Sequence, residues 1–443
     1  MNLYSLSAIE IVNKIKNSEV SAEEVALSFI ERIKEFEKDI KAWAFFDEKM
    51  FLEKAKESDQ WKLSGKPLGV LHGLPIAIKD IFKTDDMPTQ YGTPLRENYQ
   101  TRDDSSVVAT LRAAGAIIMG KTVTTELAYF DAGKTTNPHD YSRTPGGSSS
   151  GSAAAVASYM APVAIGSQTN GSLIRPASYC GVVGYKPTYG LISRRGVLRQ
   201  SFLLDQVGVF GRSVEDVAFC SASIFKKDQD DKSTISYPTE DLLKITKNEP
   251  HFEPQLIFMK TSKWESLEKD AKKDFEKFIK DNNKNITEVS MPSYFESIHE
   301  YHKIIHETDM AYNFSSIYEK DKKKLGKKLI EAIERGMNYK SKDYAKAVDS
   351  LETFYDSFKE IFHAYHAIIT PAVSNYAPKG LNFTGSPEFC TIWTYLGMPA
   401  ISLPLIQSSN KLPMGIQLVG EKFDDSRFLQ TSNWVFKNFK QKK

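Results

Sequence analysis

The sequence predicts an α/β fold, in which helices alternate with the strands of one sheet. From Leu68 the chain consists of short apolar runs bounded by Gly and Pro, such as LGVLHGLPIAIKD and VVATLRAAGAIIMGKT, which indicate strands and helices in turn. Such alternation is typical of a sheet covered by helices. The last part returns to short β-branched runs, AIITPAV, GMPAISLPLI and LPMGIQLVG, which should join the earlier strands. We therefore expect one domain over residues 1–443.

The N-terminal segment contains two helix starts that are visible in the sequence. Ser7 with Glu10 and Ser21 with Glu24 each form the Ser-x-x-Glu pattern, in which both side chains bind free backbone N–H groups at the start of a helix. We expect residues 1–66 to form N-terminal helices whose task is to pack against the rest of the domain.

The remainder of the chain divides into a core, a covering region and a closing segment. Residues 67–225 hold the alternating core, and the charged stretch from Asp228 to Pro250 indicates a surface excursion or a seam. Residues 226–365 should be mostly helical, with ITEVSMP as one interposed strand, and should cover the sheet or the mouth of a pocket. Residues 366–443 should add strands and a helix that rejoin the sheet.

Composition and charge exclude several classes of function. The 443 residues are 41% hydrophobic, and 58 Lys and Arg against 56 Asp and Glu leave a net charge of +2, which provides no basic surface for nucleic acid or an anionic membrane. No run of about 18 apolar residues occurs and the N-terminus lacks the apolar core of a signal peptide, so we expect a cytoplasmic protein. Cys180, Cys220 and Cys390 lie far apart, which predicts neither a disulfide framework nor a zinc site, and Cys180 should be a small buried hydrophobe.

The segment that begins at Pro145 carries two clusters of serine on a backbone of small residues. PGGSSSGS runs directly into AAAVASYMAPVAI, which predicts a helix and then a buried strand, and GSQTNGS follows that strand. Both clusters then lie at element ends, where backbone N–H groups are free. A serine nucleophile needs such donors for its oxyanion, and Thr169, Asn170 and Gly171, just before Ser172, are the candidates. The competing interpretation is a turn and a flexible linker.

A base for this serine is less easily identified. Neither cluster forms the G-x-S-x-G elbow of many serine hydrolases. His299, His302 and His306 would share a helix face, but they lack a carboxylate or a fourth ligand for a metal, and a surface helix is expected there. Lys79 ends the apolar run PIAIK, and burial would favour the neutral amine that can act as a base. The alternative is a structural pair of Lys79 with Asp80.

Several motifs spread along the chain match one known family. They are GLPIAIKD around Lys79, PGGSSSGSAAAVA from Pro145, GSQTNGSLIRPASYCGVVGYKPT around Ser172, LLDQVGVFGRSVEDVA, and TIWTYLGMPAISLPL with LPMGIQLVG near the end. On these motifs the chain resembles the amidase signature family. The resemblance implies a single domain whose mixed central sheet is covered by helices on both faces. It also implies a Ser-Ser-Lys triad of Ser172 as nucleophile, Ser148 as bridging serine 24 positions earlier, and Lys79 as base.

The activity that this resemblance implies is hydrolysis of a small carboxylic amide to an acid and ammonia, with neither cofactor nor metal. Neutral Lys79 would accept a proton through Ser148 while Ser172 attacks, forming an acyl-enzyme that water then releases. The family also implies a cis peptide bond from Gly147 to Ser148. The expected partner is a small-molecule amide, and the chain neither requires nor forbids a homodimer.

One loop departs from the common pattern of the family. Many members read TDTGGSIRxP, whereas SQTNGSLIRP places Arg175 three positions after Ser172, with Gln168 and Asn170 in place of Asp and Gly. Together with TNPHDYSRTPGGSSSGS and TGSPEFCTIWTYLGMP, this form resembles the malonamidase-like subgroup rather than the amidotransferase A subunit. In that subgroup the arginine faces the substrate, so Arg175 would grip the carboxylate of a half-amide. The alternative is that Arg175 only buttresses the loop through backbone carbonyls.

Two other functions stay open. One is the amidotransferase A subunit, which releases ammonia from glutamine for charged tRNA and needs partner chains. The SLIRP loop and WTYLGMP count against it. The other is a catalytically silent binding protein on the same fold, against which the joint presence of Lys79, Ser148 and Ser172 argues. The walls of the substrate pocket are expected from the middle helical region and from the loop YFDAGKTTNPHD.

Overall fold

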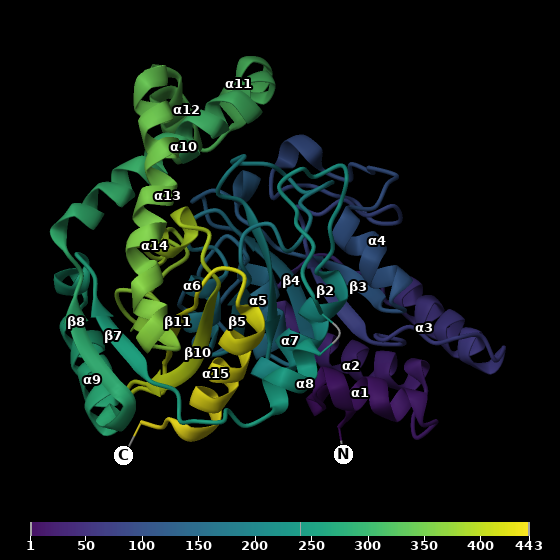
Figure 1. Ribbon diagram of the computed structural model, residues 1–443. Helices are drawn as coiled ribbons and strands as arrows, with labels where there is room; N and C mark the ends of the chain where they lie inside the picture. The colour runs from purple at the N-terminus through teal and green to yellow at the C-terminus, as the bar shows by residue number, and fades with distance from the viewer. Residues whose placement is uncertain (1, 240, 442–443) are drawn as a thin grey trace.

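Eleven strands pair into one mixed sheet in the computed structural model, which describes residues 2–239 and 241–441 (Figure 1). Their spatial order is β1-β3-β2-β4-β6-β5-β10-β11-β9-β7-β8. The strands are β1 Trp43–Phe45, β2 Pro75–Lys79, β3 Ile117–Thr122, β4 Val163–Gln168, β5 Val183–Lys186, β6 Gln206–Gly211, β7 Leu256–Lys260, β8 Ile286–Ser290, β9 Ala367–Pro371, β10 Ala400–Gln407 and β11 Pro413–Val419. The predicted α/β domain with a mixed central sheet is confirmed.

The strand directions bring three strand ends to one edge of the sheet. β2 lies parallel between β3 and β4, and these strands end at Lys79, Thr122 and Gln168. Beyond β4 the pairing is antiparallel through β6, β5, β10, β11 and β9, and it is parallel again from β9 to β7 and β8. Ligand sites of α/β sheets lie outside the carboxyl ends of parallel strands. Lys79 and the loop after Gln168 meet at such an edge.

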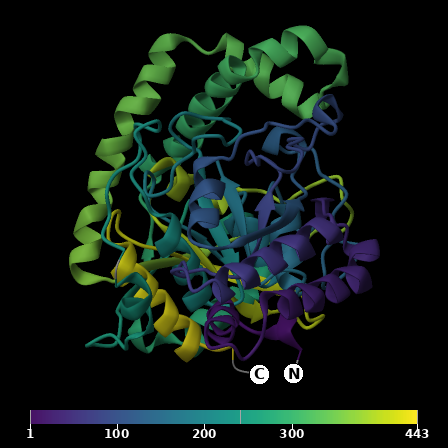
Figure 2. The same cartoon turned by 90° about the vertical axis from the view of Figure 1, so that its right-hand side faces the viewer.

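Helices cover both faces of the sheet (Figures 1 and 2). α5 and α6 pack on the central strands, whereas α7, α8 and α15 pack together and on β5, β6 and β10. The helices are α1 Ala8–Lys16, α2 Ala22–Ile40, α3 Glu48–Leu63, α4 Ser106–Ala113, α5 Ser150–Ala157, α6 Ile174–Cys180, α7 Val214–Ile224, α8 Leu242–Lys247, α9 Lys269–Asp281, α10 Ser297–Asn313, α11 Ser315–Asp321, α12 Lys327–Asn338, α13 Ser341–Ala364, α14 Glu388–Tyr395 and α15 Asp425–Asn438. None of the helices in the described residues is both long and apolar enough to span a bilayer.

The N-terminal helices begin where the sequence predicts. The side chain of Ser7 accepts from the backbone of Glu10 and that of Ser21 from the backbone of Glu24, and each glutamate bonds back to its serine N–H. Both capping boxes are therefore confirmed. The apolar core continues from these helices through the sheet to α15.

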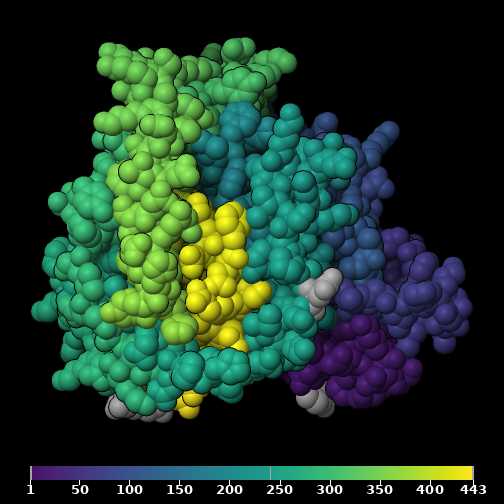
Figure 3. All heavy atoms as spheres, in the orientation of Figure 1, coloured from purple at the N-terminus to yellow at the C-terminus, as the bar shows by residue number. Residues whose placement is uncertain are grey.

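Helices α10 to α13 stand above one end of the sheet and arch over it (Figures 1 and 2). α10 packs on α12, α13 and α14, and α10 and α12 contribute to a second apolar cluster that includes Met310, Phe314 and Leu329. Figure 3 shows α13 as a ridge beside the C-terminal elements. The strand expected at ITEVSMP is confirmed as β8. β7 was not anticipated, because a run of only four apolar residues, LIFM, does not indicate a strand until its partner β9 lies beside it.

The charged stretch after residue 227 is not a seam between domains. Asp231 pairs with Arg194 at 3.2 Å and Asp228 accepts from Ser193 at 2.7 Å, so its carboxylates are tied to the core. The following residues form α8, which packs on α7 and α15. The expectation of a seam was wrong, because charge density alone does not distinguish solvated carboxylates from carboxylates paired with a distant arginine.

Candidate active site

Lys79 is completely buried at the carboxyl end of β2. Its Nζ lies 2.6 Å from Oγ of Ser148 and 2.8 Å from Oγ of Ser167, both buried hydroxyls. Burial lowers the pKa of the Lys79 amine well below its usual value, with Arg175 adding to the lowering and Asp205 opposing it. The site therefore favours a neutral amine in contact with two hydroxyls.

Asp80 does not serve as the partner of Lys79. Its carboxylate lies 3.2 Å from Nζ of Lys121, a buried lysine on the neighbouring strand β3. Lys121 also donates to Thr89 and to the carbonyl of Pro88. The alternative of a Lys79–Asp80 pair is thus wrong, because successive strand residues point to opposite faces of the sheet.

The serines of the first cluster have different surroundings. Ser148 contacts Lys79, and the peptide bond between Gly147 and Ser148 is cis, as the family resemblance implies. Ser149 and Ser152 are buried and hydrogen-bond to the backbone of β4, at Ser167 and Ile165. Only Ser148 of these serines contacts the lysine, so the others attach the start of α5 to the sheet.

The second cluster forms a loop between β4 and α6 with free backbone donors. The N–H groups of Asn170, Gly171 and Ser172 make no hydrogen bond to any residue that the structure describes. Ser172 is half-buried, and its carbonyl accepts from the N–H of Ser149 at 3.3 Å, which joins the two clusters. The loop thus offers consecutive donors beside a serine, the arrangement that an oxyanion needs.

The side chain of Gln168 determines how this loop enters α6. Its Oε1 accepts from the N–H groups of Leu173 and Ile174 at 2.9 and 3.0 Å, and its Nε2 donates to Thr394 at 2.9 Å. A buried amide here fulfils the role of a helix N-cap, because it satisfies donors that have no partner within the helix. Gln168, which departs from the common family pattern, is thereby explained.

Arg175 is 2% exposed and lies against the same loop. Its Nη2 donates to the carbonyl of Gly147 at 2.6 Å, whereas Nε and Nη1 have no partner among the described residues. A Cβ built on Gly171 would lie 3.2 Å from Nη1, so glycine permits the close approach. Arg175 therefore buttresses the loop, as one of its two interpretations expects, and it keeps two donors without a partner among the described residues.

The cavity beside Ser172 is narrow, at about 10 Å³, the space of roughly one water molecule. Its lining comes from the loop at residues 169–172, here called the catalytic loop, from α6, α10 and the start of α14, from the segment after β3 and from the connection between β5 and β6. The lining residues are Ala128, Tyr129, Phe130, Thr169, Asn170, Gly171, Ser172, Arg175, Gln200, His306 and Pro387. Entry of an amide therefore requires lining side chains to move. Walls from the middle helical region and from the YFDAGKTTNPHD loop were predicted, and His306 and Phe130 confirm both.

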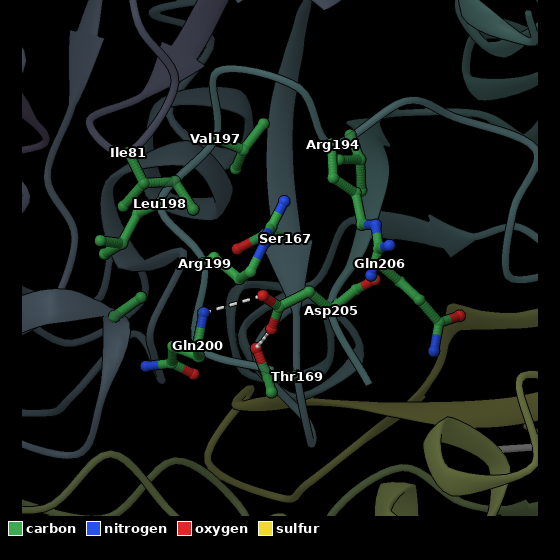
Figure 4. A pocket seen from close by; sticks show the side chains of 12 residues that line it. Ile81, Ser167, Thr169, Arg194, Val197, Leu198, Arg199, Gln200, Asp205 and Gln206 are labelled. Carbon is green, nitrogen blue, oxygen red and sulfur yellow. Dashed lines mark hydrogen bonds between the residues drawn. The ribbon is translucent and has the colours of Figure 1, made fainter. Parts of the chain in front are cut away.

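A second small cavity shares Ala128, Thr169 and Gln200 with the first (Figure 4). Asp205 accepts there from the Thr169 hydroxyl at 2.6 Å and from the N–H of Gln200 at 2.8 Å. Ser167, the second hydroxyl on Lys79, also lines this cavity. The hydroxyl of Thr169 thus has Asp205 as its acceptor.

The histidines of α10 do not lie on a surface helix. His302 and His306 are 2% and 7% exposed, and His302 Nε2 lies 2.8 Å from the carbonyl of Thr169. His306 Nε2 lies 3.1 Å from Oε1 of Gln200. The expectation was wrong, because α10 is enclosed between the catalytic loop and the helices α12 and α13. No group of three or more metal-ligating side chains occurs within the residues that the structure describes.

Sequence reasoning missed several contacting residues, among them Ser167, His302, His306 and Thr394. Ser167 stands in the quoted GSQTNGS motif, and its place at the end of a strand parallel to β2 was a usable signal. The other three belong to α10 and α14, and nothing local in the sequence links them to residues 169–172.

Known proteins of one family are similar to this chain along most of its length. The model of the Amidase family matches residues 24–429. Over its full length the chain is 30% identical to the A subunit of glutamyl-tRNA(Gln) amidotransferase from Natranaerobius thermophilus, covering 98% of that protein. The solved A subunit of the Thermotoga maritima amidotransferase is similar with a TM-score of 0.81 at 27% identity, over 99% of this chain and 96% of that one.

A solved chain from a vestigial complex related to an s-triazine catabolic enzyme has a TM-score of 0.89 at 23% identity, over 99% of this chain and 100% of that one, which supports the fold alone. The curated relatives carry the name of the amidotransferase A subunit, so the comparisons do not support the expectation that sets this chain apart from it. The family itself is clear from both the matched length and the identity. The chain belongs to the amidase signature family, whose enzymes hydrolyse the C–N bonds of amides.

Proposed function

We propose that the protein hydrolyses the carboxamide of a small molecule that carries a carboxylate, such as a short half-amide. Ser172 attacks the amide carbonyl while its proton passes through Ser148 to neutral Lys79. The N–H groups of Thr169, Asn170 and Gly171 are the candidate donors to the oxyanion, together with that of Ser172. The C–N bond then breaks, the relay returns the proton to nitrogen, and ammonia leaves. Water cleaves the remaining ester by the same relay and releases the acid.

The observation that carries the choice of substrate is the buried guanidinium of Arg175. Two of its nitrogens have no partner among the described residues, although it lies beside the loop that bears Ser172. Buried donors without an acceptor are costly, and a carboxylate is the acceptor whose geometry fits a guanidinium. A substrate carboxylate would remove this cost when it binds.

A second candidate is release of ammonia from glutamine, which the names of the curated relatives favour. Glutamine also has a carboxylate, but it adds an ammonium group. Among the described residues that line the cavity there is no Asp or Glu, and Arg175 is the one charged side chain. An ammonium there would lack a counter-charge, which favours a half-amide without one.

The test is a comparison of matched substrates. We expect malonamate to be hydrolysed with a kcat/KM about tenfold to hundredfold above that of neutral malonamide, since a charge-assisted hydrogen bond contributes about 1.5–3 kcal/mol. Arg175→Met should remove this preference. Its turnover of malonamate should fall, whereas its turnover of malonamide should stay closer to the parent value. Equal turnover of both substrates by the parent would contradict the proposal.

Glutamine hydrolysis is measured beside these substrates, with and without added amidotransferase partner chains. Ammonia release from glutamine that appears only with those chains would favour the second candidate. Labelling by a fluorophosphonate probe addresses the silent alternative, since a protein without amidase chemistry should form no adduct on Ser172.

A further inference from the structure

Two side chains from distant helices hold the carbonyl groups of the loop before Ser172. His302 of α10 lies 2.8 Å from the carbonyl oxygen of Thr169, and Thr394 of α14 donates to that of Asn170 at 2.6 Å. Both side chains are buried. The bonds span 133 and 224 positions of the chain, so neither is a product of local turn formation.

The geometry of the peptide group makes these bonds relevant to the free donors. A peptide is planar and almost always trans, so its C=O and N–H point in opposite directions. The carbonyl of Thr169 shares its peptide with the N–H of Asn170, and the carbonyl of Asn170 shares its peptide with the N–H of Gly171. A hydrogen bond that holds each oxygen therefore fixes the direction of the next N–H.

The third peptide of the loop is held locally. The carbonyl of Gly171 accepts from the N–H of Arg175 at 3.0 Å, which is the first turn entering α6. The N–H of Ser172 is thus aimed by its own helix. The two donors before it depend on α10 and α14.

We infer that His302 and Thr394 are positioning residues that aim the N–H groups of Asn170 and Gly171 at the oxyanion. The inference rests on the proposed function, because it assigns a role in the chemistry of Ser172. It also gives α10 and α14 a part in catalysis, although neither helix contributes a residue of the triad.

The hydrogen-bond directions agree with this role. The carbonyl of Thr169 can only accept, so His302 donates through Nε2, and burial lowers the pKa of this imidazole to about 4, which keeps it neutral. Thr394 accepts from Nε2 of Gln168, so its own proton is directed to Asn170. A donor on a carbonyl polarises the peptide and strengthens its N–H as a donor.

Paired substitutions test each contact. His302→Leu and Thr394→Val remove the donor at similar volume, whereas His302→Gln and Thr394→Ser keep one. The first measurement is the rate at which a fluorophosphonate labels Ser172. In that reaction the Oγ–P bond forms, the P–F bond breaks, fluoride leaves, and the serine proton passes to Lys79. The phosphonyl oxygen occupies the place of the oxyanion.

We expect His302→Leu and Thr394→Val each to lower the labelling rate and kcat for malonamate about tenfold to hundredfold, with KM within twofold of the parent. Loss of a whole oxyanion donor lowers kcat by about 10²–10³-fold, and a misdirected donor loses part of that. His302→Gln and Thr394→Ser should recover most of the rate. His299→Leu, one turn earlier on α10 and without a hydrogen-bond partner at Nε2, is the matched control and should behave as the parent.

The outcomes separate the two proposals. Parent-like labelling by folded His302→Leu and Thr394→Val overturns the positioning roles, as does a rise in KM at constant kcat. If the leucine and valine variants fail to fold, the test rests on His302→Gln and Thr394→Ser, which should show parent-like rates. A large loss of rate in these folded variants overturns the inference. Labelling of the parent without turnover of any half-amide contradicts the proposed substrate alone. An unlabelled parent contradicts both proposals.

Discussion

Two sets of residues, here called walls, lie against the loop that bears Ser172, and they differ in where along the chain their residues come from. One wall holds Lys79, Ser148 and Ser167, which come from β2, the start of α5 and β4. These elements follow one another in the core and meet at one edge of the sheet. This wall carries the proposed base and bridging serine, and its motifs were visible in the sequence.

The other wall is built by the covering helices and α14. His302, His306 and Thr394 contact the catalytic loop or its cavity from there. These residues bear no charge at neutral pH and supply hydrogen bonds and shape. On the proposed function one wall performs the chemistry and the other directs it, so substitutions on the two walls should differ in size and in kind.

The largest effect is expected for Lys79→Met, which keeps the volume and removes the amine. Without its base the relay has no proton acceptor, so kcat for an amide should fall about 10⁴-fold or more. Steady-state ammonia release from malonamate measures it. Activity within tenfold of the parent would show that another group accepts the proton.

Lys121→Met is the matched control, because it removes the buried amine on the adjacent strand. It breaks the pair with Asp80 and leaves a buried carboxylate alone, so the free energy of unfolding should fall by about 3–5 kcal/mol. Folded Lys121→Met should retain the chemistry. Denaturant unfolding separates the two lysines, one required for catalysis and one for stability.

The pH profile should report the lowered pKa of Lys79. Since the neutral amine is the active form, kcat/KM should rise with pH and reach its plateau well below pH 10.5, the usual value for lysine. The window between the lowered pKa of Lys79 in the folded protein and the usual value of 10.5 in the unfolded chain also matters for stability. In that window the folded protein binds fewer protons than the unfolded chain. The free energy of unfolding should therefore increase with pH through that window, and Lys79→Met should abolish this increase.

Ser148→Ala is expected to have an intermediate effect. A water molecule in place of the hydroxyl can still bridge Lys79 and Ser172, so kcat should fall about 10²–10³-fold rather than to the level of Lys79→Met. Ser152→Ala, in the same cluster but bound to Thr122 and to the carbonyl of Ile165, should keep nearly full turnover. A loss as large as that of Lys79→Met would mean that water cannot substitute.

Ser167→Ala should have a smaller effect on the same wall. It removes one of two hydrogen bonds of the Lys79 amine, a contribution of about 1 kcal/mol, so kcat should fall about fivefold to tenfold. The acid limb of the pH profile should shift with it, because the amine loses a polar neighbour. An unchanged profile would mean that the contact has no influence on the base.

The smallest effect is expected on the covering wall, for His306→Leu. This residue lines the cavity and bonds to Gln200 rather than to the loop, so it should raise KM severalfold and leave kcat nearly unchanged. Progress curves at varied malonamate concentration separate the two constants. A drop in kcat without a change in KM would place His306 with the reacting groups.

The sequence alone predicted much of the fold and one wall of the site. Strand and helix periodicity indicated the α/β core and ITEVSMP, and the Ser-x-x-Glu patterns placed the first two helices. β7 and the burial of α10 were missed, because a short apolar run and a helix face with three histidines acquire their environment only from packing partners. Asp228 and Asp231 were interpreted as solvated for the same reason.

Sequence by itself supplied the motifs of the proposed reacting groups, Lys79, Ser148 and Ser172, and an arginine at position 175 near the proposed nucleophile. Tertiary structure decided that Lys79 is buried without a counter-ion, that Arg175 keeps two unpaired donors, and that α10 and α14 hold the loop. The physical reason is that residue type specifies which chemistry is available. A pKa, a free donor or a peptide orientation depends on neighbours brought together from distant parts of the chain.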